Sequence, residues 1–446
     1  MCLCAGRDHR RGLAVPRHHR KRTGGSQRAS GIAELREPRT QERSHVTDDH
    51  RTPAGLRRAN TAAALRAVLD AGPLPRADLT ERLGLAAGTV SRIVAPLVAA
   101  GLLRELPAVP GAGGRPRIPV DLVPRARYAI GVHVGRQRTT AGLVDLRGRV
   151  HQVRTHERSP GHIPQLIEGA ADLVTDLRKE AGTVPVLGVG VATGGWVEPA
   201  TGVVVDNEAL GWRNVPLRAL LTRALGPDLP VLVDSGARAQ ATAEVWFGCA
   251  RGAETSVHLF TGNVIDAALA MGRRIHTGAR SAAGMIGHLP VGAAGPACAC
   301  GRRGVLQAVA SDRAVVDAAA NAGIVTADEG LARLHVLAAT GTEAADRLLR
   351  ERARQIGTAV AHLVDLFDPS LIVLSGGVLP YTDEVRDEAA RLVGGSWEPD
   401  RVRPTALGPH ALAASSGALL LSAYYADPLA YETADATRVA ERPGRP

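Results

Sequence analysis

The sequence lacks the features that would place the protein in or beyond a membrane. Its 446 residues contain no uninterrupted apolar run near the ~18–20 residues that span a bilayer. Charged residues recur from Arg7 onward, so the N-terminal segment lacks the apolar core of a secretion signal. The 5 cysteines are too few for a disulfide framework in so long a chain. We therefore expect a cytoplasmic protein with no membrane partner.

Positive charge is concentrated near the N-terminus. The formal net charge is +10, and residues 1–60 contain 14 Lys and Arg against 6 Asp and Glu. This segment has little apolar periodicity and is rich in Arg, Gly, Ser and His, so we predict a basic, disordered extension over residues 1–55. Such an extension could lie along DNA phosphates or simply be solvated, and we favour the second interpretation. A polar tail is expected over residues 427–446.

A helix-turn-helix pattern follows the basic extension. In "TAAALRAVLDAG" the apolar residues Leu65, Val68 and Leu69 share one helical face. "PRADLTERLGL" predicts a short helix that ends at Gly84, where a left-handed residue is least costly. "AAGTVSRIVAPLVAAGLL" restarts the helical spacing of apolar residues. The order of these elements predicts a winged helix-turn-helix over residues 56–122.

Polar residues at the start of the third predicted helix are candidate DNA readers. They should face away from the apolar stripe. A helix of this kind can enter the major groove, where Arg bonds guanine bidentately and Thr or Ser reaches phosphates or a thymine methyl group. Pro96 is expected to kink or end the helix beyond them. The helical residues that we predict to bind DNA are Arg76, Gly88, Thr89, Ser91 and Arg92.

The next segment has the pattern of a wing. In "LLRELPAVPGAGGRPRIPVDL" two short extended pieces flank a Gly-rich tip that carries Arg115 and Arg117. These arginines could reach a phosphate or the minor groove. The alternative is a structural three-helix module with a flexible basic linker. The winged tip favours the first interpretation, with double-stranded DNA as the partner.

Residues 123–426 alternate predicted strands with predicted helices, which indicates an α/β body. "YAIGVHVGRQRTTAGLVDLRGRVHQVRTH" predicts three strands joined by two polar turns. Further short apolar runs, such as "VLGVGVAT" and "SLIVLSGGVL", end in glycine-containing turns. The clearest helical stretches lie between the strands, at residues 163–181, 236–247, 311–321 and 343–367.

Several motifs of this body resemble those of the ROK group (repressors, open reading frames and kinases). They include "GVGVATGGWVEPATG", "ATAEVWFG", "CACGRRGVLQAVAS" and "DPSLIVLSGGV". The resemblance covers roughly residues 61–426, and it implies an actin-like, two-lobed sugar kinase fold behind a winged head. The expected fold class is therefore α/β, with an N-terminal winged helix-turn-helix followed by a ROK-type body.

The resemblance also implies that the catalytic base is absent. The Asn-Asp pair of the family's kinases falls on Ser235 and Gly236, and glycine cannot accept a proton. General-base assistance contributes roughly 10²–10⁴-fold to a rate. Asp234 would substitute only if its side chain, at the end of a strand, turned toward the substrate. The Asp of the family's Asp-x-Gly motif beside the ATP phosphates becomes His133.

The phosphate-binding turn departs from the family pattern as well. The kinases have Gly-x-Gly-x-Gly, whose backbone N–H groups approach phosphate oxygens. Those positions fall on Thr261, Asn263 and Ile265, and we expect Ile265 to crowd the cradle and Asp266 to repel an anion. Because several parts of phosphoryl transfer are altered together, we predict no catalytic residues and no bound ATP.

The sugar pocket keeps only part of its polar set. The family's Gly-Glu-x-Gly-His motif places Met285, which we expect to be buried, where the acid belongs, and Gln307 replaces a later acid. Neutral groups can still bond a hydroxylated ligand, without charge assistance. The predicted effector-binding residues are Ser235, His288 and Gln307.

The resemblance further implies an incomplete zinc site. His288, Cys298 and Cys300 match three ligands of the family's structural zinc, and the fourth position is Val305. Structural zinc prefers four ligands, so water or another side chain would have to complete the shell. The alternative is two reduced thiols in a loop.

These observations favour a transcriptional regulator, a repressor by family habit. Two heads on a homodimer would bind a palindromic operator, and a sugar or sugar derivative would shift the body between two arrangements. One alternative is an ATP-dependent sugar kinase with an appended DNA-binding segment and Asp234 as base. Another is an assembly module whose helix-turn-helix is only structural.

Overall fold

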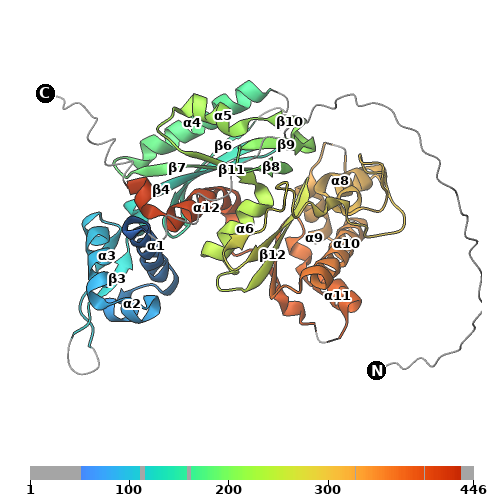
Figure 1. The fold of residues 1–446 in the computed structure, drawn as a ribbon. Helices are drawn as coiled ribbons and strands as arrows, with labels where there is room; N and C mark the ends of the chain where they lie inside the picture. The colour runs from blue at the N-terminus through green and yellow to red at the C-terminus, as the bar shows by residue number, and fades with distance from the viewer. Residues whose placement is uncertain (1–51, 111–115, 158–161, 327, 396, 433–446) are drawn as a thin grey trace, which may run out of the picture. The chain divides into compact units, whose positions relative to one another are not determined.

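The computed structural model describes residues 52–110, 116–157, 162–326, 328–395 and 397–432 (Figure 1). Residues Asp49–Pro446 make up one compact unit. In the described segments no single helix is both long and apolar enough to cross a membrane. One bent helix pair, Arg76–Leu83 with Ala87–Ala99, meets that criterion only when its two members are joined. Most of the predicted basic extension and polar tail lie outside the described residues, as does Arg115.

Helix α1 (Pro53–Ala71) begins earlier than the apolar pattern indicated, inside the segment assigned to the extension. The hydroxyl of Thr52 accepts a hydrogen bond from the backbone N–H of Gly55 at 2.9 Å. Pro53 occupies the first turn, where its missing N–H has no intrahelical partner to lose. Capping residues lie outside the apolar stripe, so periodicity alone placed the helix start too late.

The other elements of the head complete the predicted winged helix-turn-helix. Gly84 ends α2 in the left-handed conformation, with φ of 62°. Pro96 lies inside α3 on an exposed position, and the helix continues to Ala99 before it ends. The three short strands form one sheet in the order β1-β3-β2. The elements after α1 are β1 (Leu74–Pro75), α2 (Arg76–Leu83), α3 (Ala87–Ala99), β2 (Leu103–Glu105) and β3 (Pro119–Leu122).

The first lobe of the body is built on a five-stranded sheet in the order β11-β7-β4-β5-β6. Helix α4 packs against β4, β5 and β6, and α5 packs against α4 (Figure 1). A small antiparallel sheet, β10-β9-β8, extends this lobe. Its elements are β4 (Tyr128–Val134), β5 (Arg138–Asp145), β6 (Val150–Glu157), α4 (Ile163–Ala181), β7 (Val186–Thr193), β8 (Trp196–Glu198), β9 (Val203–Asn207), β10 (Trp212–Val215), α5 (Leu217–Leu225) and β11 (Val231–Ser235).

The second lobe repeats this plan with a five-stranded sheet in the order β14-β13-β12-β15-β16. Helices α10 and α11 pack side by side in this lobe (Figure 1), and a separate apolar core joins its helices to its sheet. Its elements are β12 (Thr255–Thr261), β13 (Ile265–Met271), β14 (Arg274–Ile275), α7 (Leu306–Ala310), α8 (Asp312–Asn321), α9 (Leu331–Ala339), α10 (Glu343–Phe367), β15 (Leu371–Gly376), α11 (Thr382–Val393) and β16 (Val402–Pro404).

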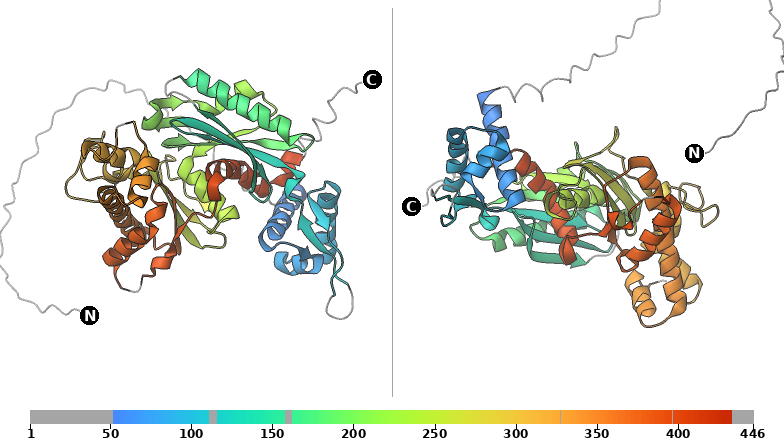
Figure 2. Two further views of the ribbon diagram at one scale, coloured as in Figure 1. Left: turned by 180° about the vertical axis from the view of Figure 1, so that it is seen from behind. Right: turned by 90° about the horizontal axis from the view of Figure 1, so that it is seen from below.

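Two helices, α6 (Gly236–Phe247) and α12 (Ala411–Ala426), lie between the sheets of the two lobes (Figures 1 and 2). Helix α12 packs on β4 and β7, and α6 packs on α12 and on β12 and β13. The approach to the first sheet is close, because a Cβ added to Gly190 would lie 1.9 Å from the carbonyl oxygen of Ser416. The two-lobed, actin-like arrangement that the sequence predicted is confirmed.

Candidate functional site

Helix α3 buries its apolar stripe and leaves the polar residues of its first turns accessible. Val94 is 0% exposed, whereas Gly88, Ser91 and Arg92 are exposed and Thr89 is half-buried. The guanidinium of Arg92 folds back over this end of the helix, with Nε 3.3 Å from the carbonyl oxygen of Gly88. This surface is therefore available to a groove of DNA.

The other predicted DNA-binding arginines make ion pairs inside the head. Arg76 lies 2.7 Å from Glu105, which ties α2 to β2. Arg117, at the base of the wing, lies 3.3 Å from Asp78 of α2. A DNA contact by either arginine would have to compete with these pairs or share the guanidinium with them.

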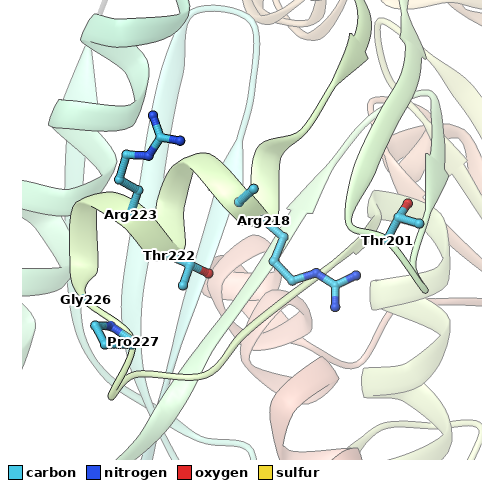
Figure 3. Close-up of a pocket in the computed structure, with 7 residues that line it drawn as sticks. Thr201, Arg218, Thr222, Arg223, Gly226 and Pro227 are labelled. Carbon is cyan, nitrogen blue, oxygen red and sulfur yellow. The ribbon is translucent and has the colours of Figure 1, made fainter.

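A shallow cavity of 520 Å³ lies along α5 in the first lobe (Figure 3). Arg218 donates from its guanidinium to the carbonyl oxygen of Pro199 at 3.1 Å and to that of Ala200. One of the two arginine side chains of the cavity is therefore already bonded. None of the predicted effector-binding residues lines it; the lining is Thr201, Arg218, Ala219, Thr222, Arg223, Gly226 and Pro227.

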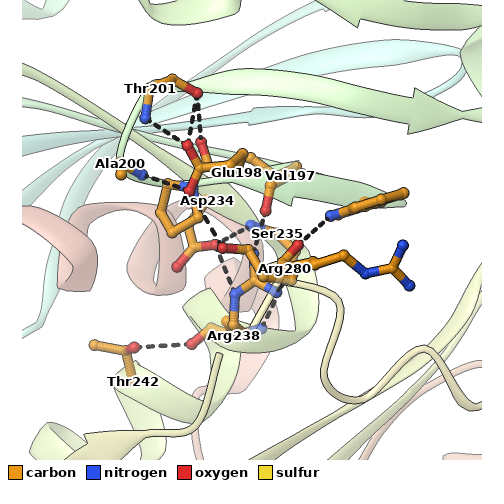
Figure 4. A network of polar contacts seen from close by, with 12 residues as sticks. Val197, Glu198, Ala200, Thr201, Asp234, Ser235, Arg238, Thr242 and Arg280 are labelled. Carbon is orange, nitrogen blue, oxygen red and sulfur yellow. Dashed lines mark hydrogen bonds and ion pairs between the residues drawn. The ribbon is translucent and has the colours of Figure 1, made fainter. Parts of the chain in front are cut away.

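A buried arginine, Arg238 of α6, joins the two lobes (Figure 4). Its Nε donates to the carboxylate of Asp234 at 2.7 Å, and the residue is 3% exposed. Its remaining nitrogens donate to the carbonyl oxygen of Val197 in the first lobe at 2.7 Å and to that of Ser281 in the second at 3.0 Å. We call this set of contacts the Arg238 bridge.

Two further hydrogen bonds cross between the lobes beside the Arg238 bridge. The indole N–H of Trp196 donates to the carbonyl oxygen of Arg280 at 2.8 Å. The hydroxyl of Ser281 donates to Glu198 at 3.2 Å. Trp196 and Glu198 belong to β8, whereas the other two residues lie in the loop after β14. Protein groups thus join β8 to this loop without a ligand.

The strand-to-helix junction carries no free carboxylate. Asp234 accepts from Arg238 and from the backbone N–H of Ser235, the latter at 2.7 Å. The hydroxyl of Ser235 caps α6 by accepting from the backbone N–H of Arg238 at 3.4 Å. Gly236 is the first residue of the helix. The spacing of Asp234 and Arg238 was a signal that could have identified the pair, and the sequence analysis missed it.

Asp266 is a second buried acid at the lobe boundary. It is 9% exposed, and burial raises its pKa to about 7 against the opposing effects of Arg238 and of a hydrogen bond from the backbone N–H of Gly195. Ile265 does not project as expected: it is 0% exposed and packs in the core of the second lobe. The expectation that Ile265 crowds a phosphate cradle was therefore wrong, because successive strand residues face opposite sides.

Gln307 holds the turn that leads into β13. Its Oε1 accepts from the backbone N–H of Ile265 at 2.9 Å, and its Nε2 donates to the carbonyl oxygen of Asn263 at 2.7 Å. Gln307 and Ser235, both predicted to bind an effector, thus each have their polar groups in contacts within the protein. A ligand would have to exchange those contacts for its own.

His133, which stands where the resemblance implies an acid, is neutral near physiological pH. Burial lowers its pKa to about 4, and the charge of Arg138 acts in the same direction. A neutral imidazole here supplies no carboxylate for a metal-bound nucleotide.

Met285 is not the buried residue that the sequence analysis expected. It is 44% exposed and directly precedes a short 3₁₀ helix, Ile286–His288. The turn around Gly284, whose φ is 89°, passes close to the backbone of Ala267. Methionine therefore does not line a closed apolar pocket.

The three predicted metal ligands do come together. The ligand atoms of His288, Cys298 and Cys300 all lie within 4.8 Å of one another. A hydrogen bond from the backbone N–H of Arg302 lowers the pKa of Cys300, which favours the thiolate that zinc requires. Val305 is 2% exposed and offers no donor. Nitrogen and sulfur donors suit zinc, and the set is one ligand short of a structural site.

Comparison with known proteins agrees with this architecture. Residues 129–422 match the ROK family and residues 54–111 the MarR family. A transcriptional regulator of Mycobacterium tuberculosis is 35% identical over 412 residues, which are 87% of this chain and 91% of that protein. The xylose repressor of Bacillus spizizenii is 23% identical over 380 residues, 82% of this chain and 96% of the repressor.

A solved structure shares the fold. It is that of a ROK family transcriptional regulator, a homologue of the Escherichia coli MLC protein, with a TM-score of 0.70 and 22% identity. The alignment covers 85% of this chain and 99% of the solved one. The chain described here belongs to the ROK family, and its ROK region follows a MarR-type winged helix-turn-helix.

Proposed function

We propose that the protein is a DNA-binding transcriptional regulator that represses sugar-related genes. The observation that carries this proposal is α3, which buries its apolar stripe inside a complete winged head and leaves Gly88, Ser91 and Arg92 exposed. Residues 54–111 match the MarR family, and a relative of this chain is a transcriptional regulator. Both findings support a DNA-binding head. A xylose repressor among the relatives supports repression and a sugar-related target.

DNA recognition would use two heads. A symmetric homodimer presents two α3 helices, which fit a palindromic operator with half-sites one or more helical turns apart. Arg92 would bond a base, and the exposed Ser91 and the half-buried Thr89 would fix the helix on the phosphates. Arg76, Arg115 and Arg117 would add contacts to the backbone or the minor groove.

The body would act as a sensor without phosphoryl transfer. Gly236 offers no proton acceptor, and Asp234, the nearest acid, is held by Arg238. Thr261, Asn263 and Ile265 stand where the family's kinases have a glycine-rich turn, so the backbone cradle for a polyphosphate is altered. These features support a body that binds and transmits rather than one that catalyses.

A hydroxylated ligand bound between the two lobes would be the signal. Ser235, His288 and Gln307 are the proposed effector contacts, and each of them already has a polar contact within the protein. A sugar or sugar derivative that exchanges these bonds for its own would favour a different arrangement of the lobes. Only such a difference in affinity for two arrangements can change the affinity for DNA.

A structural zinc ion would be held by His288, Cys298 and Cys300, with water or a further side chain as fourth ligand. Zinc would fix the loop that carries His288. Metal analysis of protein purified without chelator tests this assignment, and Cys300→Ser should lower the metal content. Equal zinc in the variant and the parent would contradict it.

The principal test measures DNA binding by the full chain. Fluorescence anisotropy with DNA from upstream of its own gene should show sequence-specific, salt-dependent binding. Arg92→Ala should weaken specific binding by about tenfold, the effect of one base contact, and non-specific binding by less. Arg178→Ala, an exposed arginine on α4, is the matched control. Absence of specific binding to any upstream DNA would contradict the proposed function.

A sugar kinase with an appended head is the second candidate, because the ROK family includes kinases. It requires Asp234 as base. A coupled assay with ATP and a panel of hexoses distinguishes the two functions, because turnover that Asp234→Asn abolishes would support the kinase and overturn the proposal of a silent body.

A further inference from the structure

A pocket of 380 Å³ lies where the head meets the body. Its lining contains three arginines, Arg147, Arg149 and Arg251, and one histidine, His410. The lining contains no aspartate or glutamate. We call it the junction pocket, and its lining is Leu69, Arg147, Gly148, Arg149, Val150, Trp246, Phe247, Arg251, Ala406, Leu407, Pro409, His410 and Ala414.

The turn that carries two of the arginines is fixed before any ligand binds. The carboxylate of Asp145 accepts from the backbone N–H of Arg147 at 2.8 Å and from that of Arg149 at 3.0 Å. Gly148 between them has φ of 77°, and a Cβ there would lie 2.5 Å from the ring of Phe247. The turn thus packs on an aromatic ring and presents an arginine on each side of that contact.

The three arginines of the pocket differ in the partners that their guanidinium groups already have within the protein. Arg147 lies 2.6 Å from Asp121 of β3. Arg251 donates to the carbonyl oxygen of Asp70 in α1 at 2.7 Å, and its guanidinium lies 3.6 Å from the carboxylate of the same residue. Across the described residues, no ion pair to Arg149 is found, and this side chain is exposed. An anion in the pocket would therefore meet the guanidinium of Arg149, which has no ion pair among the described residues. It would also meet Arg147 and Arg251, whose partners lie outside the pocket lining.

The remaining lining is apolar and aromatic. Leu69, Trp246 and Phe247 form a wall beside the arginines, and Arg273 stacks over Trp246 at 4.4 Å. Guanidinium groups recognise phosphate oxygens bidentately, while an apolar wall suits the carbon part of a ligand. The combination fits a small organic molecule with a phosphate group better than a neutral sugar.

We propose that the junction pocket binds the phosphate group of a small phosphomonoester, with Arg149 as the principal contact and Arg147 and Arg251 as partners. The expected effect of the bound phosphate on DNA binding rests on the proposed function. It follows from the ion pairs of Arg147 with Asp121 and of Arg251 with Asp70. Asp70 and Asp121 belong to the head, and the arginines that hold them belong to the body. A bound phosphate competes with both acids, so its affinity depends on how the head is held.

The test uses the full chain and two probes, inorganic phosphate and glucose 6-phosphate, at constant ionic strength. Isothermal titration calorimetry should detect both, and Arg149→Ala should weaken both by about tenfold, the loss expected for one charge-assisted contact. Arg178→Ala on α4 is the control and should bind like the parent. If glucose 6-phosphate binds more tightly than inorganic phosphate, the apolar wall contributes to binding. If the two probes bind equally, the protein recognises only the phosphate group.

Two results would overturn the proposal: no heat from either probe, or equal affinities in the parent and in Arg149→Ala. Titration of the protein–DNA complex then measures the coupling. Glucose 6-phosphate should change the DNA affinity of the parent and not that of Arg149→Ala. If Arg149→Ala instead loses DNA affinity in the absence of phosphate, the side chain contacts DNA and the pocket assignment is wrong. If the parent binds no DNA, the proposed function fails while calorimetry still decides the pocket.

Discussion

At the scale of single residues, the contact between the lobes depends on the ion pair of Asp234 and Arg238. A buried pair contributes little net stability compared with an apolar pair of the same shape, but removing one partner leaves an uncompensated charge. Arg238 also donates to carbonyl oxygens of both lobes. Its side chain therefore contributes both to stability and to the contact between the lobes.

Arg238→Met should lower the free energy of unfolding by ~3 kcal/mol, because Asp234 remains buried without its partner. Adding Asp234→Leu should restore much of the loss. Urea denaturation followed by circular dichroism measures both variants. If the double variant is no more stable than Arg238→Met, the carbonyl contacts, and not the charge pair, dominate the role of Arg238.

Asp266 gives the protein a pH dependence of opposite sign to that of a salt-bridged acid. Its pKa of about 7 in the native state exceeds the model-compound value of 3.8, so the native state holds the proton more tightly than the unfolded state. Stability is then lost as pH rises from about 4 to about 7. The cause is burial, which penalises the charged form.

Asp266→Asn should remove this loss. The variant should gain stability relative to the parent as pH rises through that window, by on the order of 4 kcal/mol above it. The Asn oxygen can still accept from the backbone N–H of Gly195. Thermal melts at pH 5 and pH 8 measure the difference, with Asp172→Asn, an exposed acid on α4, as control. A difference independent of pH would show that Asp266 is ionised throughout.

At the scale of secondary-structure elements, small residues allow α12 to pack close to the sheet of the first lobe. The helix "ALAASSGALLLSAYYA" has small residues where it meets β4 and β7, and both strands place glycines beneath it. A Cβ at Gly131 would lie 2.0 Å from the carbonyl oxygen of Ala413. This contact brings α12 close to the sheet and positions α6 for the Arg238 bridge.

Gly190→Ala should destabilise the protein by ~2 kcal/mol or more, because the added methyl group meets the backbone of α12 and the helix must move. Gly88→Ala is the matched control: nothing lies within 4 Å of its added Cβ, and alanine favours a helix over glycine. Differential scanning calorimetry should show a lower melting temperature for the first variant only. Equal melting temperatures would mean that α12 accommodates the methyl group without cost.

Across the whole molecule, the head and the first lobe share one apolar core. Leu65 of α1 and Tyr425 of α12 belong to the same buried cluster, and both are 0% exposed. A continuous core couples the unfolding of the parts that it joins. The head is therefore not expected to behave as a module on a flexible linker.

Leu65→Ala should lower the melting temperature of the head and the first lobe together, with a loss of ~2–5 kcal/mol. Calorimetry on the full chain detects this as one shifted transition. A separate transition of small enthalpy, moved alone by Leu65→Ala, would show that the head unfolds independently and would weaken any coupling through the junction pocket.

The sequence by itself determined the elements of the head, the α/β order of the body and the ROK resemblance. These depend on local periodicity, on turn residues such as Gly84 and on motifs within short segments. The gathering of His288, Cys298 and Cys300 was also foreseen, because their spacing resembles that of a known site.

Only the tertiary structure decided which polar groups are available. Arg238 bonds carbonyl groups on two different lobes, and Gln307 bonds the turn at Ile265, 42 residues away. Met285 is exposed because of the course of the chain around it. Ile265 is buried because its position in β13 faces the core of the second lobe. Hydrogen-bond partners and burial depend on segments that are distant in the chain, so no local pattern specifies them. The junction pocket likewise brings together Leu69 of α1, the turn between β5 and β6, the end of α6 and residues 406–414, which are distant in the chain.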